Sequence, residues 1–418
     1  MFSRESWMTG APGFRRNVLH SFLAMNLGIY IQVPFCRTKC TYCNFHTGVF
    51  SSSMYSPYVD GVVREIFERD ALYSSAGISS NTCRCAAELA VDTVYMGGGT
   101  PSLLAPADLG RMLDALRGSF RCALQEVTLE ADPETITAEK VQAWASAGIN
   151  RISMGTQSFD DRELSAAGRL HRSADIYTAD KTLRVNGIHN ISFDLIAGLP
   201  HQTEESWKRT VSELIALAPE HVSIYMLEID EGSRLGREVL KGGARYSAGT
   251  IPVDDSIADF YEYACVELSA AGYEHYEISN WAKPGLRSKH NLKYWTREPY
   301  FGIGAGAHSF DGATRWANAH DPAGYASALS AGRLPVEQKE VLSEAQALDE
   351  ELFLGLRLLE GIGVAALQAR YNTALWNSLR NRIDSLVERG FVEWHGDRLC
   401  LAAERISVSN EVFVELIS

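Results

Sequence analysis

The chain has 418 residues, which is too long for one ordinary core and predicts two or three domains. Its hydrophobic content of 46% and charged content of 22% are typical of a soluble globular protein. The formal net charge of −13 would repel phosphate backbones, so nucleic acid is not an expected partner.

Cysteine content and hydropathy narrow the class of protein further. Eight cysteines in a chain of this length do not make the disulfide framework of a small secreted protein. No apolar run reaches the roughly 20 residues of a membrane span, so no transmembrane segment is expected, and a peripheral membrane contact is left open. These features predict a cytoplasmic protein.

The first 26 residues differ from the rest of the chain. They contain Arg4, Arg15 and Arg16 and a short apolar stretch, 18–27, that continues into the first predicted strand. A signal peptide needs a dispensable apolar run and a cleavage site. Residues 1–26 are therefore predicted to be a disordered extension, with Met25 as an alternative start and a targeting peptide as the weaker alternative.

Residues 27–235 alternate short apolar runs with longer amphipathic stretches. The apolar runs predict six strands, at residues 27–34, 91–96, 126–130, 150–154, 191–196 and 221–227. The amphipathic stretches predict helices between them, at residues 56–73, 106–120, 137–147, 203–217 and in the stretch up to 184. Six such repeats with short connections predict an α/β fold with a parallel sheet. The pattern leaves open whether the sheet forms a partial barrel or an open doubly wound sheet.

Two further regions follow. Residues 236–335 begin with a glycine-rich stretch, contain a predicted helix at 255–271 and then show no clear period. Residues 336–418 are predicted to be helical and to carry a hairpin of strands 391–394 and 398–401, like a winged-helix module. The predicted domains are therefore 27–235, a connecting region 236–335 and a C-terminal domain 336–418. Because this tail lacks a basic stripe, a structural role or docking of a partner is favoured over DNA binding.

A cluster of three cysteines follows the first predicted strand. Cys36, Cys40 and Cys43 have the spacing C-x₃-C-x₂-C. Three thiolates can hold three irons of a [4Fe–4S] cluster and leave the fourth iron without a protein ligand. Zinc is the main alternative, but a closed zinc site needs four ligands. The nearest candidates for a fourth ligand are His46, Cys83 and Cys85.

Glycine and polar residues stand where the other predicted strands end. The triple glycine 97–99 follows the second strand, Glu130 ends the third, Gln157 follows the fourth and Asp194 lies on the fifth. In parallel βα folds, ligand-binding residues gather at the carboxyl ends of the strands. Glycines at such a position let the backbone approach a ligand closely. The sequence therefore predicts one rim that carries the cysteines, a glycine backbone and several polar groups.

Four long motifs in this order resemble the radical SAM superfamily. They are residues 30–36 (YIQVPFC), 97–102 (GGGTPS), 150–158 (NRISMGTQS) and 194–200 (DLIAGLP). The likeness runs from about residue 28 to the C-terminus. It is strongest to the branch that contains the oxygen-independent coproporphyrinogen dehydrogenases and the heme chaperone group HemW. This resemblance implies a partial parallel (β/α)₆ barrel followed by a helical, winged-helix-like domain.

The resemblance also implies a role for each motif residue. Cys36, Cys40 and Cys43 would ligate a [4Fe–4S] cluster whose open iron binds S-adenosylmethionine (SAM). The residues that would contact SAM are Gly98, Gly99 and Thr100 at the methionyl end, Glu130, Gln157 and Asp194 at the amine and ribose, Arg169 at the carboxylate, and Tyr30 and Tyr42 along the pocket. A guanidinium suits a carboxylate because its donors match both oxygens. The alternative for Arg169 is a solvated helix residue.

Two features discriminate between the relatives within this branch. Coproporphyrinogen dehydrogenases carry a further cysteine two residues after the third cluster cysteine, where this chain has Phe45. The segment 290–295 is an HNxxYW motif, which is typical of the HemW group. Imidazole is a good axial ligand for heme iron, so His290 is predicted to contact heme. The alternative is a hydrogen-bonded core histidine, and His308 is a second candidate ligand.

These features predict a heme chaperone that delivers heme to acceptor proteins and contains a SAM-binding cluster. The alternative is an oxygen-independent coproporphyrinogen III dehydrogenase that uses a 5′-deoxyadenosyl radical. No catalytic residue is assigned. Cys83 and Cys85 are interpreted as free thiols or a labile redox pair.

Overall fold

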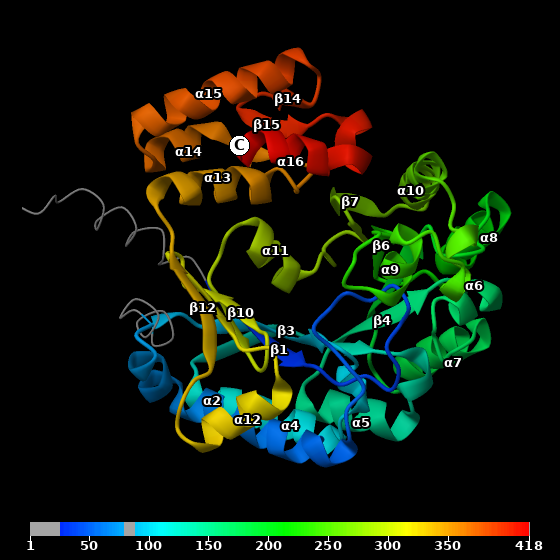
Figure 1. Ribbon diagram of the computed structural model, residues 1–418, viewed down its shortest axis with the longest axis vertical. Helices are drawn as coiled ribbons and strands as arrows, with labels where there is room; N and C mark the ends of the chain where they lie inside the picture. The colour runs from blue at the N-terminus through cyan, green and yellow to red at the C-terminus, as the bar shows by residue number, and fades with distance from the viewer. Residues whose placement is uncertain (1–25, 79–87, 418) are drawn as a thin grey trace, which may run out of the picture.

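A computed structural model describes residues 26–78 and 88–417 of the chain (Figure 1). The predicted N-terminal extension up to residue 25 and the two cysteines Cys83 and Cys85 lie outside the described residues.

The core of the fold is a sheet built from the six predicted strands. They are β1 Leu27–Val33, β2 Val91–Gly98, β3 Cys122–Ala131, β4 Arg151–Gln157, β5 Asn190–Ala197 and β6 His221–Met226. These strands pair in parallel in chain order, because a helical segment crosses back between each strand and the next. The described strands continue on both sides to the order β12-β11-β10-β9-β1-β2-β3-β4-β5-β6-β8-β7, which does not close on itself. The prediction of an α/β fold with a mostly parallel sheet is confirmed.

Residues from the region after 272 extend this sheet at both edges. They form β7 Glu274–Glu277 and β8 Asn280–Ala282 beside β6, and β9 Tyr300–Ile303, β10 His308–Phe310, β11 Thr314–Asn318 and β12 Val336–Val341 beyond β1. Strand β9 runs parallel to β1, and the other added strands pair in antiparallel fashion. The sequence shows no period here because strands β7 to β11 have only three to five residues.

Helices cover the sheet and connect its strands. Their bounds are α2 Tyr55–Ser75, α4 Pro106–Ser119, α5 Ala138–Ala147, α6 Asp161–Ala166, α7 Ser173–Val185, α8 Glu204–Leu217, α9 Arg234–Leu240, α10 Asp254–Ala270, α11 Lys289–Trp295 and α12 Pro322–Ser330. Short 3-10 helices are η1 Ser52–Met54, η2 Pro101–Leu103, η3 Pro133–Thr135 and η4 Arg245–Thr250. Figure 1 shows α2, α4, α5 and α12 together on one side of the sheet. Within the described residues, no helix is both long and apolar enough to cross a membrane.

Capping residues in the sequence set where helix α5 begins and ends. The hydroxyl of Thr137 accepts a hydrogen bond from the backbone N–H of Lys140 at 3.3 Å, so α5 begins there. Gly148 ends α5 in the left-handed region at φ 93°, which a glycine adopts without strain. Between these caps, Val141 and Trp144 point into the core. The predicted helix 137–147 is therefore confirmed.

The C-terminal residues form a second, smaller core. Helices α13 Glu344–Gly355, α14 Val364–Arg370, α15 Thr373–Glu388 and α16 Ser409–Ile417 and the 3-10 helix η5 Ala403–Val408 pack with the strands β13 Ile362–Gly363, β14 Val392–His395 and β15 Arg398–Leu401. The β14–β15 hairpin lies where the sequence predicts it. This domain is joined to the large sheet at β7, since the N–H of Ile278 donates to the carbonyl of Arg357 at 3.2 Å.

Candidate functional site

A cavity of about 510 Å³ lies at the carboxyl ends of the parallel strands. Strands β2 to β6 provide its floor, and the loop after β1 provides a wall. The C-terminal domain completes its lining with Arg357, Ser407, Ser409 and Asn410. The volume is typical of sites for small molecules and cofactors. The cavity therefore occupies the rim that the sequence predicts.

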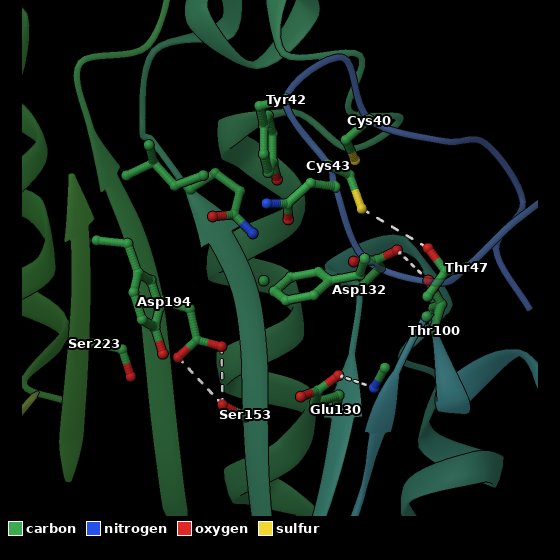
Figure 2. Close-up of a pocket in the computed structure, with 18 of the residues that line it drawn as sticks. Cys40, Tyr42, Cys43, Thr47, Thr100, Glu130, Asp132, Ser153, Asp194 and Ser223 are labelled. Carbon is green, nitrogen blue, oxygen red and sulfur yellow. Dashed lines mark hydrogen bonds between the residues drawn. The ribbon is translucent and has the colours of Figure 1, made fainter. Parts of the chain in front are cut away.

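The three motif cysteines lie on the loop of residues 36–47, called the cysteine loop below. Cys36, Cys40 and Cys43 are all partly exposed, and all three line the cavity. The N–H of Cys36 donates to the carbonyl of Gly48 at 2.8 Å, which ties the two ends of the loop together, and the N–H of Thr41 donates to that of Ala167 at 3.0 Å, which holds its middle. Figure 2 shows Cys40 and Cys43 at the same end of the cavity.

The surroundings of the thiols differ from one cysteine to the next. Burial raises the pKa of the Cys36 thiol to about 11. The Cys40 sulfur accepts a hydrogen bond from Arg169 at 3.5 Å, and the Cys43 sulfur lies 3.8 Å from the hydroxyl of Thr47. Thiolate formation at Cys36 therefore needs a cation to replace the proton, whereas Cys40 already has a guanidinium beside it.

The glycine run after β2 presents bare backbone to the cavity. Gly98 adopts φ 108°, and a Cβ added to it would lie 2.4 Å from the carboxamide of Gln32. A Cβ on Gly99 would lie 2.6 Å from the carbonyl oxygen of Phe35. No side chain fits at either position. The predicted close-approach backbone is therefore in place beside Thr100, which also lines the cavity.

Two buried carboxyl groups face the same space. Glu130 accepts a hydrogen bond from the N–H of Gly98 at 2.9 Å, and burial raises its pKa to about 7. Asp194 accepts from the hydroxyl of Ser153 at 2.9 Å and from Ser192 at 3.1 Å, and burial raises its pKa as well. Glu130 is on β3 and Asp194 on β5, on either side of β4, and Figure 2 shows both groups at the same end of the strands. Since each also repels the other's charge, a ligand that donates hydrogen bonds here would be stabilised.

Gln157 ends β4 in an unusual backbone conformation. Its φ is 64°, in the left-handed region that residues other than glycine rarely adopt. Gln157 also lines the cavity. Backbone strain of this kind concentrates at functional sites.

Arg169 lies in the loop between α6 and α7 and not on a solvated helix. Its side chain is 8% exposed, and its guanidinium forms an ion pair with Asp132 and donates to the carbonyl of Gly155 at 2.8 Å. Its Nε atom is buried without a hydrogen-bond partner among the described residues. Asp132 is a residue that the motifs do not point to, although it stands in the same Glu-Ala-Asp-Pro segment as Glu130.

The two tyrosines expected along the pocket lie at different depths. Tyr42 lines the cavity beside Cys40. Tyr30 is not among the lining residues and instead stacks on Tyr95, with ring centroids 6.1 Å apart. Tyr95 lines the cavity in its place. Further lining residues are Arg151 and Ser153, which stand inside the motif 150–158 without an expected role, and Ser223, Tyr225, Arg357 and Asn410, which lie outside the four motifs. Arg151 and Ser153 could have been found from the alternation along β4, whereas nothing in the sequence marks Arg357 or Asn410.

His290 lies inside the protein. Its side chain is fully buried on α11, and burial lowers its pKa to about 3. The Nδ1 atom is 2.9 Å from the hydroxyl of Thr93, and the Nε2 atom is 3.0 Å from the hydroxyl of Tyr294. Both ring nitrogens are therefore engaged, which is the geometry of the core-histidine alternative. Heme contact by His290 stays a prediction and requires α11 to move. His308, the second candidate, is exposed at the start of β10.

Two family models match the chain. The model of the Radical SAM superfamily matches residues 30–214, and the model of the HemN C-terminal domain matches residues 342–404. The first match runs from within β1 into α8 and so includes the cysteine loop and the rim residues of β2 to β5, and the second covers most of the small C-terminal core.

The chain is also similar to proteins of known name. It is 31% identical over 386 residues to the heme chaperone HemW of Bacillus subtilis, covering 92% of this chain and 97% of that protein. It is 36% identical to heme chaperone HemW of Mycobacterium tuberculosis, covering 90% of each chain. Coproporphyrinogen III oxidase HemN of Escherichia coli has a similar fold, with a TM-score of 0.78 at 18% identity over 96% of this chain and 93% of that one. The chain therefore belongs to the HemW family within the radical SAM superfamily.

Proposed function

We propose that this chain is a heme chaperone that binds heme and passes it to heme-accepting proteins, and that its rim holds a [4Fe–4S] cluster and SAM. The observation that carries the proposal is its identity of 31% to 36% with seven proteins named heme chaperone HemW, over 88% to 93% of its length. Phe45, at the position of the missing cysteine, and the HNxxYW motif point in the same direction.

The cysteine loop suits a [4Fe–4S] cluster. In such a cluster each thiolate binds a different iron, so the three sulfurs need not meet at one point. Among the described residues, no three His, Cys, Asp or Glu side chains converge on a single ion, which a zinc site would require. The cluster would supply one-electron chemistry to a bound SAM.

Each rim residue is proposed to contact a different part of SAM. The backbone of residues 98–100 would accept and donate hydrogen bonds at the methionyl end. The free Nε of Arg169 would meet the methionyl carboxylate, while Asp132 holds the guanidinium in place. The polar groups proposed for the amine and the ribose hydroxyls are Glu130, Gln157 and Asp194. Tyr42 would form a wall, and Tyr30 would act by supporting Tyr95.

Heme titration tests the proposal. Anaerobically reconstituted protein is titrated with ferric heme and followed by its absorbance spectrum, and the loaded protein is then mixed with apomyoglobin. We expect saturable binding and transfer of heme to apomyoglobin. Absence of saturable binding to a fully clustered sample would refute the chaperone function.

Decarboxylation of coproporphyrinogen III is the second candidate. It is favoured by Arg357, which lines the cavity beyond the rim residues. The Nε of Arg357 is buried without a hydrogen-bond partner among the described residues and could bind a propionate of the substrate. An anaerobic assay with dithionite, SAM and coproporphyrinogen III decides it. Protoporphyrinogen formation supports the enzyme, and its absence from a fully clustered sample rules the enzyme out.

We further propose that the protein works in the cytoplasm and that residues 27–235 act as the radical SAM unit. The cysteines among the described residues are free, as expected in a reducing compartment. The small C-terminal domain would then be available to contact a heme recipient.

A further inference from the structure

Three histidines from distant parts of the sequence meet at one place on the surface. His46 lies in the cysteine loop, His308 begins β10 and His320 follows β11. The rings of His46 and His320 stack with centroids 3.7 Å apart and planes 25° apart. His308 pairs with Ala317 across β10 and β11, three residues before His320, and burial and then the charges of His320 and His46 lower its pKa.

The backbone around these residues keeps the cluster in shape. The N–H of Asn318 donates to the carbonyl of Ala307 at 3.0 Å, and the N–H of Gly306 donates to that of Ala319 at 3.0 Å. Gly306 adopts φ 72°, and a Cβ there would lie 2.8 Å from the Nδ1 of His320. A glycine at this position is therefore what leaves room for the third imidazole.

Imidazole nitrogens remain available in this cluster. Within the described residues, no hydrogen bond occupies a ring nitrogen of His46 or His308, and both residues are exposed. The Nδ1 of His320 is buried without a partner, and its Nε2 lies 3.9 Å from Glu337. This availability contrasts with His290, where hydroxyl groups occupy both nitrogens.

The surface beside the imidazoles is apolar and carries a cation. Phe45 is 65% exposed and Val49 is 62% exposed, both within three residues of His46. The Nζ of Lys39 donates to the carbonyl of Phe45 at 3.2 Å, which holds this cation on the same loop. A flat apolar macrocycle with a central iron and two carboxylates matches such a surface.

We propose that His46, His308 and His320 form a heme site beside the cysteine loop, where an exposed imidazole ligates the heme iron and the porphyrin contacts Val49 and Phe45, the second of which also lines the cavity. Lys39 would pair with a propionate. The site rests on the proposed heme-binding function and assigns it a location other than His290. A bare metal ion is disfavoured, because no three His, Cys, Asp or Glu side chains among the described residues converge on one ion. Heme needs only one imidazole on a given face.

Ferric heme titration of matched variants tests the location. The variants are the triple change His46→Ala, His308→Ala and His320→Ala, the single change His290→Ala, and His395→Ala, an exposed histidine on the β14–β15 hairpin, as control. We expect the triple variant to bind heme about tenfold or more weakly, and to lose the spectrum of an imidazole-ligated iron. His290→Ala and His395→Ala should keep the affinity and spectrum of the unmodified protein.

Other outcomes distinguish a wrong location of the heme site from a wrong assignment of heme binding. If the triple variant binds heme like the unmodified protein and His290→Ala does not, the surface site is wrong and heme binding stands. If the unmodified protein binds no heme, both fail. Val49→Glu changes the apolar surface without touching a ligand, and we expect it to weaken heme binding with the cluster content unchanged. Equal heme affinity of Val49→Glu and the unmodified protein would contradict the contact.

Discussion

Strands β1 to β6, which carry the rim, and strands β7 to β12 belong to the same sheet but join it differently. The first six pair in parallel in chain order, and the later ones are added at the two edges. On the rim, each motif stands at the end of a strand whose direction is fixed by its βα unit, so the motif order translates directly into one cavity. In the later segment, the HNxxYW motif starts on a seven-residue helix, and this places His290 inside the protein. The difference shows that the order of motifs predicts a shared cavity where all of them stand at the same ends of parallel strands, whereas a motif on a separate helix gives no such placement.

The largest effect should come from the rim itself. Replacing Cys40 by alanine removes one iron ligand and the sulfur beside Arg169, so we expect the cluster to be absent after anaerobic reconstitution. Iron and sulfide content together with the visible spectrum measure this.

Cys122→Ala is the matched control, because that thiol is partly buried outside the cysteine loop. The control should keep a full cluster. A Cys40→Ala variant with full iron content would mean that Cys40 does not bind the cluster.

Glu130 should make stability fall with rising pH. Its pKa in the folded protein is about 7, above that of an unfolded glutamate near ~4.3, so between these values the folded state holds a proton that the unfolded state has lost. Stability is therefore lost as pH rises through this window. Glu130→Gln should remove that loss and stabilise the SAM-free protein at pH 8 by up to ~3 kcal/mol relative to pH 5. Chemical unfolding at both pH values measures it.

Glu65→Gln separates stability from binding. Glu65 is also buried with a pKa of about 7, but it is bonded to Tyr325 and Asn318 away from the cavity. Each variant should lose the share of the pH dependence of stability that comes from its own carboxyl, and only Glu130→Gln should weaken SAM binding, measured by calorimetry. Equal SAM affinities would remove Glu130 from the proposed contacts.

Much of the rim could be predicted because local signals and topology agree there. The cap Thr137 and the stop Gly148 set α5 correctly, and Glu130, Gln157 and Asp194 all line the cavity. The ion pair between Arg169 and Asp132 could not be predicted, since it joins side chains from different loops. Strands β7 to β11 were not predicted because three to five residues cannot show a period, and so the contact between His46 and His320 was not predicted either. The prediction that residues 336–418 are helical up to the hairpin is wrong at 336–341, which form the edge strand β12.

If His290 on α11 has only a structural role, replacing it should cost as much stability as replacing a buried histidine on the parallel sheet. His290→Ala leaves the hydroxyls of Thr93 and Tyr294 without their partner, and we expect a loss of about 2 kcal/mol in the free energy of unfolding. His221, on β6, is also fully buried, with Ser192 and Tyr276 at 2.8 Å, so His221→Ala is the matched comparison. Similar losses of stability, with heme binding kept in both, are expected. A loss of heme binding confined to His290→Ala would restore the motif histidine as a ligand.

The smallest effect concerns the backbone behind the histidine cluster. Gly306→Ala forces an L side chain into φ 72° and brings its Cβ against His320, and left-handed strain alone should cost about 1 kcal/mol of stability. Gly272 has a similar φ of 87° with nothing within 4 Å of an added Cβ, so Gly272→Ala carries the strain without the clash. Thermal unfolding should show similar losses, while heme titration should show weaker binding for Gly306→Ala alone. If both variants bind heme equally well, the position of the His320 ring has no part in heme binding, and strands β10 and β11 have only a structural role there.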